Sequence, residues 1–447
     1  MNNVYWQPLN MANGGLEINI VKGEKNYLYD DTGKKYIDGY SGLWNVVLGY
    51  HENNIINAVL KQAQELPFVN PITLKTPIST ELAEKICEIT HENISKIVYT
   101  CTGSEAIETA IKFARKYSCL KNRKRHVIAI MENSYHGSYY GSMAASNYEK
   151  ETKDGYGPML EGFVSLPLPF SRKNENNKLD EDMKASILSE LKDRLESNKD
   201  TLCGIIVEPV LASGGVIPLF KEYIDYINDF CNKNDILFIC DEVATGFWRT
   251  GDRFRFQKFD IKPDIITLSK GLNNGYLPIG CVCISKKIEE VFEKNKEVIF
   301  HLSTQDANPI CLASALETLK RFEVLEIQKK VKNVADEFAK NIEQKIKSLY
   351  FVSEVRQIGL MIAIDLVYTR EENEPISNAD LMKVVTYLYQ KGCIIGVSFT
   401  KAITSSLLLF PAYIMENSDI EYMIDMIKEA ILEELGGKKD GKSSEKM

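Results

Sequence analysis

The chain has 447 residues, a formal net charge of −8, and hydrophobic and charged fractions of 44% and 26%. This length predicts more than one domain, and the acidic balance argues against a role in binding nucleic acid or an anionic membrane surface. No apolar run approaches the roughly 18 residues of a membrane span and the first ten residues show no secretory pattern, so we expect a cytoplasmic protein.

The ten cysteines and five histidines show no spacing typical of a metal site. No C-x-x-C pair occurs, and Cys240, Cys281 and Cys283 lie inside apolar runs, which is typical of reduced core residues. We therefore expect neither a disulfide framework nor a metal.

The first 90 residues predict a small antiparallel unit followed by two helices. Residues 16–50 alternate strand-like segments with turns, as in LEINIV and NYLYDDTGKKYIDGY. Apolar residues at helical spacing predict a helix from Ile55 to Leu66 and a second from Ser79 to Glu88, with Ser79 as its N-cap.

A glycine-containing turn follows the apolar run at 97–101. Thr102, Gly103 and Ser104 come directly before a segment with apolar residues at helical spacing. The free N–H groups and the positive dipole end of such a helix suit a phosphate group. By itself, however, a serine at Ser104 is more often only an N-cap.

Four more apolar runs occur at 127–131, 204–208, 236–240 and 264–268, with helical segments such as 220–234 between most of them. Strands that alternate with helices predict an α/β fold with a mainly parallel, doubly wound sheet. Ligands of such sheets gather at the carboxyl ends of the strands.

The last two runs deliver Asp241 and Lys270 to that edge. A desolvated lysine loses proton affinity, and its free amine can then condense with an aldehyde. A carboxylate can pair with a protonated pyridine nitrogen and keep the ring an electron sink. Taken singly, a solvated lysine and a helix-capping aspartate are the commoner readings.

Together, the segments DEVATGFWRTG and PDIITLSKGLNNGYLPIG resemble the signature of the class III, or omega-type, aminotransferases of pyridoxal-phosphate (PLP) fold type I. The resemblance implies that pyridoxal 5′-phosphate is the cofactor, that Lys270 forms its Schiff base, that Asp241 holds the pyridinium nitrogen, and that Val243 packs beneath the ring.

The same resemblance implies the domain organisation. We expect a large cofactor-binding domain over 55–310, a small α+β domain from segments 1–54 and 311–434, and a polar tail over 435–447.

Further motifs match the family in order along the chain. TGSEA resembles its phosphate-binding turn, with Glu105 beside it, and SYHG resembles its aromatic-His-Gly element, in which the aromatic ring stacks on the cofactor and Gly137 leaves room for it. The further cofactor contacts that the resemblance implies are Gly103, Ser104, Tyr135, His136, Glu208 and Thr304.

Thr304 in the family reaches the cofactor phosphate of the neighbouring subunit, which implies an obligate homodimer with shared active sites. Gln305 and Asp306 depart from the aromatic-Ser or aromatic-Gly pair that usually follows. The resemblance therefore does not define the pocket wall beside the phosphate.

Two substrate contacts follow from the resemblance. Trp44 corresponds to the aromatic residue at the substrate entrance, although a tryptophan packed in a domain interface is the alternative. SFTKAITSSLLLFPAY lacks the arginine with which many relatives hold a carboxylate, and Lys401 lies near its usual position. Residues 211–213, Leu-Ala-Ser, also replace the Gln or Glu found in relatives. We therefore expect one substrate to lack an α-carboxylate.

The predicted activity is ping-pong transfer of an amino group from an amine or amino-acid donor to a keto or aldehyde acceptor. An aminomutase, a decarboxylase, an epimerase or a catalytically silent binding subunit on the same scaffold remain alternatives. A nicotinamide dehydrogenase is disfavoured because no G-x-G-x-x-G follows any of the strands.

Overall fold

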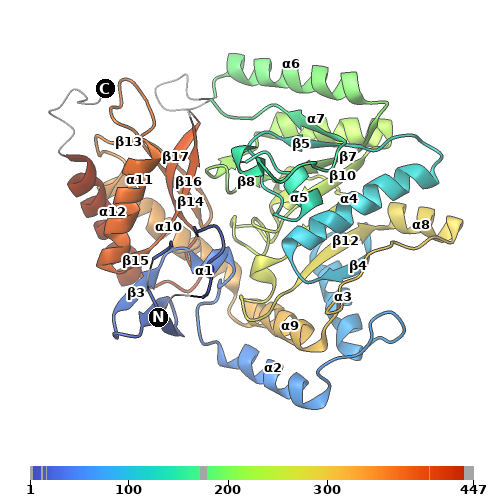
Figure 1. The fold of residues 1–447 in the computed structure, drawn as a ribbon, viewed down its shortest axis with the longest axis horizontal. Coiled ribbons are helices and arrows are strands. Elements are labelled where there is room, and N and C mark those ends of the chain that lie inside the picture. Colours follow the sequence, from blue (N-terminus) through green and yellow to red (C-terminus); the bar gives the residue numbers. More distant parts are fainter. Residues whose placement is uncertain are drawn as a thin grey trace.

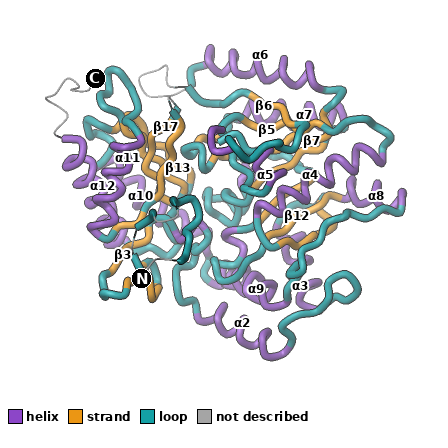
Figure 2. The backbone as a smooth tube through the Cα atoms, in the orientation of Figure 1, coloured by secondary structure: helices purple, strands orange, loops and turns teal. Residues whose placement is uncertain are grey.

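The computed structural model describes residues 4–11, 14–16, 18–148, 150–171, 179–401 and 403–436. A large body surrounds a seven-stranded sheet, and a smaller body is made from the two ends of the chain (Figure 1). The backbone view shows that the helices of the large body lie on both sides of its strands (Figure 2). Among the described residues, no helix is long and apolar enough to cross a bilayer.

The seven-stranded sheet has the order β4-β12-β11-β10-β7-β5-β6, and only β12 runs antiparallel to its neighbours. The expected mainly parallel α/β sheet is confirmed, and its five apolar runs are β4, β5, β7, β10 and β11. The sequence analysis missed β6 and β12. The strands are β4 (Ile94–Thr100), β5 (Val127–Met131), β6 (Phe163–Leu166), β7 (Leu202–Val207), β10 (Leu237–Asp241), β11 (Ile265–Leu268) and β12 (Gly280–Ser285).

Helices cover both faces of this sheet, which is why its central strands read as continuous apolar runs. In β10, Leu237 and Ile239 pack into the core on the α4 side, whereas Phe238 and Cys240 pack into the core that contains α7. The helices of the large body are α2 (Asn53–Glu65), α3 (Pro77–Ile89), α4 (Gly103–Leu120), α5 (Tyr140–Ala144), α6 (Glu181–Asn198), α7 (Lys221–Asn234), α8 (Lys286–Asn295) and α9 (Pro309–Val324).

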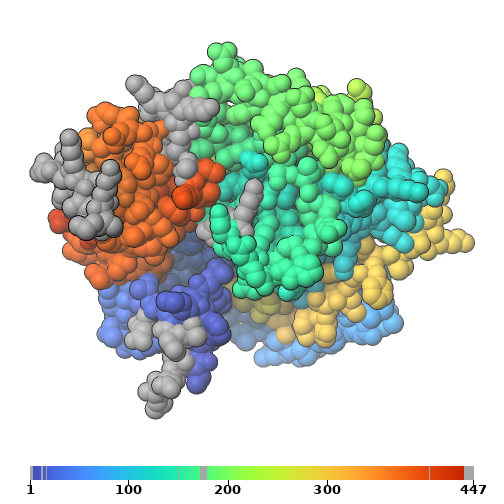
Figure 3. Space-filling view, turned by 45° about the horizontal axis from the view of Figure 1, so that its top comes forward, coloured from blue at the N-terminus to red at the C-terminus, as the bar shows by residue number. Residues whose placement is uncertain are grey.

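The smaller body joins the N-terminal and C-terminal segments. Strand β15 from the C-terminal part pairs parallel with β3, extending the expected antiparallel unit β1-β2-β3. A second antiparallel sheet has the order β13-β14-β17-β16. The space-filling view shows the blue N-terminal and orange C-terminal surfaces adjoining each other (Figure 3). The elements are β1 (Ile20–Glu24), β2 (Tyr27–Asp30), β3 (Lys35–Asp38), α1 (Ser41–Trp44), α10 (Ile327–Lys345), β13 (Val352–Ile358), β14 (Met361–Leu366), α11 (Asn378–Lys391), β15 (Cys393–Ile394), β16 (Gly396–Thr400), β17 (Thr404–Leu409) and α12 (Asn417–Gly436).

Two expected domain limits fall within helices. The limit between residues 54 and 55 lies in α2, and that between 310 and 311 lies in α9. Of the expected polar tail, residues 435 and 436 end α12, and residues 437–447 lie outside the described residues.

The N-cap expected at Ser79 is wrong. Helix α3 begins at Pro77, and its N-cap is Thr76, whose side chain accepts from the Ser79 N–H. Proline is favoured in the first helical turn because it has no N–H to leave unpaired. Ser79 therefore takes the third helical position and completes a capping box with Thr76.

Candidate active site

The carboxyl ends of three neighbouring parallel strands bring together three of the predicted residues. Glu208 directly follows β7, Asp241 ends β10, and Lys270 stands two residues beyond β11. Because β7, β10 and β11 are adjacent and parallel, these side chains meet at one edge of the sheet.

The Asp241 carboxylate is buried and held from three directions. Its Oδ2 lies 2.7 Å from His136 Nδ1, and its Oδ1 accepts from the Val243 N–H at 3.1 Å and the Thr267 hydroxyl at 3.0 Å. Burial lowers the pKa of His136, but the hydrogen bond and charge of Asp241, together with the charge of Glu208, raise it overall. His136 and Asp241 are therefore held as a charge-coupled pair inside the protein.

Glu208 fixes the segment that carries Tyr135. Its Oε1 accepts from the Tyr135 N–H at 2.8 Å, and its Oε2 accepts from the Ala212 N–H at 3.2 Å. Burial raises the pKa of Glu208 to about 7, although His136 and the two N–H groups act against this rise. The Tyr135 side chain remains partly exposed, so its ring is available to a ligand.

Lys270 is the cation at the centre of this group. Burial lowers the pKa of its amine to about 8; Asp241 and Glu208 act in the opposite direction, and the charge of Arg249 adds to the lowering. Its Nζ lies 3.9 Å from the centroid of the Trp44 indole ring. A larger fraction of Lys270 is thus free amine near neutral pH than of an ordinary lysine.

Trp44 is packed as the alternative reading of the sequence expects, and its role at a substrate entrance stays a prediction. The indole is buried, and it stacks on Phe410 of the C-terminal segment with ring centroids 4.3 Å apart and planes at 10°. The same ring faces the Lys270 amine. Trp44 therefore packs between segments from the two ends of the chain and also forms a wall beside the lysine.

The start of α4 has the geometry of an anion site. Its N-cap is Thr102, which accepts from the Glu105 N–H at 3.1 Å, so the capping role considered for Ser104 is wrong. The Ser104 hydroxyl instead accepts from the Ser138 N–H at 3.3 Å. The N–H groups of Gly103 and Ser104 have no acceptor within the described parts of the chain. They remain available to a phosphate group.

Two glycines permit the close packing around this turn. A Cβ on Gly103 would lie 2.9 Å from a methyl carbon of Val243. A Cβ on Gly137, where φ is +134°, would lie 2.4 Å from Ser104 Oγ. The phosphate turn, Val243 and the segment after Tyr135 are consequently in direct contact, as a compact cofactor site requires.

Two predicted residues lie outside this group. Thr304 is exposed on a turn between α8 and α9, and Lys401 is exposed on the turn between β16 and β17. Within the described residues, neither side chain forms a hydrogen bond or an ion pair with Lys270, Asp241 or the α4 turn. The adjacent Thr400 hydroxyl donates to Asn133 Oδ1 at 3.1 Å, which attaches the Lys401 turn to the large body.

Arg249 is a neighbour of the site that the sequence analysis did not single out. Its guanidinium is fully buried, donates to the Pro411 carbonyl at 2.6 Å and the Trp44 carbonyl at 3.4 Å, and lies 4.8 Å from the Tyr413 ring centroid. It forms no ion pair with a carboxylate in the described portion of the protein. The motif DEVATGFWRTG contained this residue, but an arginine in a motif gives no signal of burial.

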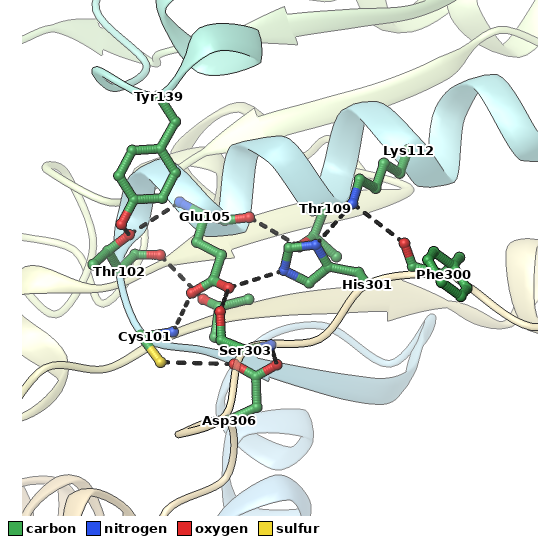
Figure 4. Close-up of polar contacts among 11 residues, drawn as sticks. Cys101, Thr102, Glu105, Thr109, Lys112, Tyr139, Phe300, His301, Ser303 and Asp306 are labelled. Carbon is green, nitrogen blue, oxygen red and sulfur yellow. Dashed lines mark hydrogen bonds and ion pairs between the residues drawn. The ribbon is translucent and has the colours of Figure 1, made fainter. Parts of the chain in front are cut away.

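Cys101, Glu105 and Asp306 form a further group, with ligand atoms within 4.8 Å of one another (Figure 4). Their carboxylates accept hydrogen bonds from the protein itself, namely from Cys101, Ser303 and His301. We therefore interpret the group as a hydrogen-bond network.

The sequence profile of the aminotransferase class-III family matches residues 10–431. The chain belongs to this family. Among its relatives are the adenosylmethionine-8-amino-7-oxononanoate aminotransferase of Staphylococcus aureus, 30% identical over 92% of this chain and 91% of the relative, and the vanillin aminotransferase of Capsicum annuum, 34% identical over 80% and 79%. The PMP-bound form of an aminotransferase from Vibrio fluvialis has the same fold, with a TM-score of 0.87, 28% identity, and coverage of 94% of this chain and 93% of the other.

The protein is thus a class III aminotransferase of PLP fold type I, an enzyme that transfers amino groups with pyridoxal phosphate as cofactor. The site fits that cofactor, because a lysine with a lowered pKa, a fixed carboxylate and an open helix N-terminus lie around one strand edge. These three groups match the aldehyde, the pyridine nitrogen and the phosphate of pyridoxal phosphate.

Proposed function

We propose that Lys270 attaches the cofactor and moves the proton in a ping-pong transamination. The observation that carries this proposal is the place of Lys270 at the strand edge that also holds Asp241, where burial lowers the pKa of its amine to about 8. Bound pyridoxal phosphate supplies the electron sink for the reaction. The free Lys270 amine would take the proton from the substrate carbon as general base and then return it as general acid.

The residues around Lys270 would orient the pyridoxal phosphate. Asp241, held by His136 and Thr267, offers a fixed negative charge to the pyridine nitrogen. Tyr135 and Val243 would contact the ring, and the N–H groups of Gly103 and Ser104 would bind the phosphate. Glu208 contributes by fixing the Tyr135 backbone.

We further propose that one substrate lacks an α-carboxylate. The Arg249 guanidinium donates hydrogen bonds to the backbone carbonyls of Pro411 and Trp44. Arg356 pairs through both terminal nitrogens with Asp365 at 2.8 and 2.7 Å, so both arginines already have protein partners. Lys401 offers a single exposed ammonium without the fork geometry of arginine. Trp44 then faces the substrate as an apolar wall. The name of one relative, the vanillin aminotransferase, contains such a compound, since vanillin is an aldehyde without a carboxylate.

A homodimer with shared active sites completes the proposal. Thr304 is exposed, and apolar side chains are exposed around it in sequence at Val298, Phe300 and Leu302. Ala307 of the same segment lines a groove of about 610 Å³ together with residues of α3, of β4 and of the loop before α3. A second copy of the chain would cover this surface and receive Thr304 at its cofactor phosphate.

All ten cysteines are free, which supports a cytoplasmic location.

The first test is a half-reaction. Cofactor-loaded protein is mixed with single amines, with and without a carboxylate, and the absorbance of the lysine-bound cofactor is followed. We expect amines without a carboxylate to convert the cofactor, because the aromatic wall accepts them. Conversion by α-amino acids alone would contradict the proposed substrate class.

A variant tests the role of Lys270 separately. Lys270→Ala should bind the cofactor through Asp241 and the α4 turn but lose turnover by at least about a thousandfold, since the general base is gone. Substantial turnover in this variant would show that another residue carries the reaction.

A further inference from the structure

The Glu105 carboxylate lies between the phosphate turn and the segment that carries Thr304. Its Oε2 accepts from the backbone N–H of Cys101, just before the Thr102 N-cap, at 2.7 Å. Its Oε1 accepts from His301 Nε2 at 3.1 Å and from the Ser303 hydroxyl. Figure 4 shows the carboxylate between these two parts of the chain. One buried carboxylate therefore joins two segments about 200 residues apart in sequence.

The Thr304 turn is closed at its base by a second carboxylate. Asp306 Oδ2 accepts from the Ser303 N–H at 2.7 Å, and the Asp306 N–H donates to the Ser303 carbonyl at 3.0 Å. Thr304 and Gln305 form the exposed tip between these two residues. The geometry of the tip thus depends on Ser303 and Asp306, and Ser303 is in turn held by Glu105.

Cys101 links the two carboxylates, because its backbone N–H donates to Glu105 and its thiol donates to Asp306. Burial, with the charges of Glu105 and Asp306, raises the pKa of this thiol to about 12, so it stays protonated. Its Sγ lies 3.7 Å from Asp306 Oδ1 and donates to it. The phosphate turn and the base of the Thr304 turn are consequently connected twice, by Glu105 bound to Ser303 and by the Cys101 thiol bound to Asp306.

We propose that Glu105 is a positioning residue that sets the phosphate turn of its own subunit and the Thr304 turn offered to the partner subunit in one fixed arrangement. This inference rests on the shared active site proposed above. Glu105 contacts neither cofactor nor substrate in it. Its loss would weaken cofactor binding at two sites, at its own through the turn at Cys101 and at the partner's through Thr304.

Hybrid dimers separate the two effects. Two differently tagged chains are co-expressed, and the mixed dimer is isolated on both tags. One chain carries Lys270→Ala, so that only the other chain can give the absorbance of lysine-bound cofactor. In the test dimer the Lys270→Ala chain also carries Glu105→Gln, and the chain with the reporting site is unchanged.

We expect the reporting site of the test dimer to bind cofactor about tenfold more weakly than that of a dimer with Lys270→Ala alone, because a lost hydrogen bond to a charged group is worth about this much. Ser303→Ala in place of Glu105→Gln should give a similar loss, and the two changes together should be less than additive since they break one contact. The matched control is Glu108→Gln on the same helix, whose carboxylate binds the Ser142 N–H. It should leave the reporting site unchanged.

A third hybrid dimer distinguishes a failure of the positioning role of Glu105 from a failure of the shared active site. Here the Lys270→Ala chain carries Thr304→Ala, which removes the proposed contact in the partner's site. If this dimer loses affinity and the Glu105→Gln and Ser303→Ala dimers do not, the positioning role of Glu105 is wrong. If the Thr304→Ala dimer also retains full affinity, the shared active site itself is wrong, and the inference falls with it.

Discussion

The amine of Lys270 lies over the face of the Trp44 indole, with Nζ 3.9 Å from the ring centroid. The ring attracts the protonated amine, whereas burial favours the neutral one. Burial lowers the pKa of the Lys270 amine to about 8, while the charges of Asp241 and Glu208 act against the lowering. The contact also places an apolar surface directly beside the proposed reacting centre.

The rate at which the cofactor-free enzyme captures pyridoxal phosphate should rise with pH and level off above about pH 8. Only the neutral amine of Lys270 can attack the aldehyde, and an ordinary lysine would level off near pH 10. Stopped-flow absorbance measures this rate. A profile that still rises at pH 10 would contradict a lowered pKa.

The same group affects stability. Because the folded pKa of Lys270 lies below its unfolded value, its contribution is fully present above about pH 10.5 and is lost as the pH falls through about 8. Lys270→Met should remove this dependence from the free energy of unfolding of the cofactor-free protein. Denaturant titrations at several pH values make the comparison.

Arg249→Met should destabilise the protein by about 2–4 kcal/mol and raise the pKa of Lys270. The substitution leaves the Pro411 and Trp44 carbonyls without their donor and removes the positive charge that helps to lower that pKa. The capture-rate profile should then shift to higher pH. The substitution Lys61→Met, of an exposed lysine, is the control. A capture-rate profile that is unchanged in Arg249→Met would show that the charge of Arg249 does not lower the pKa of Lys270.

Glu208→Gln should flatten the pH dependence of stability between about pH 4.5 and 7. The folded pKa of Glu208 is raised to about 7, so its contribution is fully present below pH 4.5 and is lost as the pH rises through 7. The amide cannot ionise and shows no such loss. The difference in unfolding free energy between the two proteins should change by up to about 3 kcal/mol over this range. A constant difference would show that Glu208 titrates normally.

Lys401→Gln tests recognition of carboxylates. If the exposed ammonium binds them, the KM of substrates that carry a carboxylate should rise about five- to tenfold, while substrates without one keep their KM and all keep their kcat. The surface variant Lys61→Gln is the control. Equal effects on both substrate classes would exclude a specific carboxylate contact.

Local patterns in the sequence were sufficient for most of the large body. Apolar runs over β4, β5, β7, β10 and β11 predicted the mainly parallel sheet because both faces of these strands are covered by helices. Strand β12 was missed because its run, followed at once by α8, was not recognised as an antiparallel member of the same sheet. The N-cap of α3 was misplaced because its start is decided by Pro77 rather than by the nearest serine.

By itself, the sequence determined that Lys270 and Asp241 stand at strand ends, and its motifs carried the resemblance to the class III family. These are properties of short segments, and a strand end fixes where the next residues point. Only the tertiary structure decided that Trp44 stacks on Phe410, that Arg249 lies buried beneath it, and that Glu105 reaches the Thr304 segment. Each of these contacts joins residues hundreds of positions apart. Spacing along the chain carries no information about them, because they exist only once segments far apart in sequence have packed against one another.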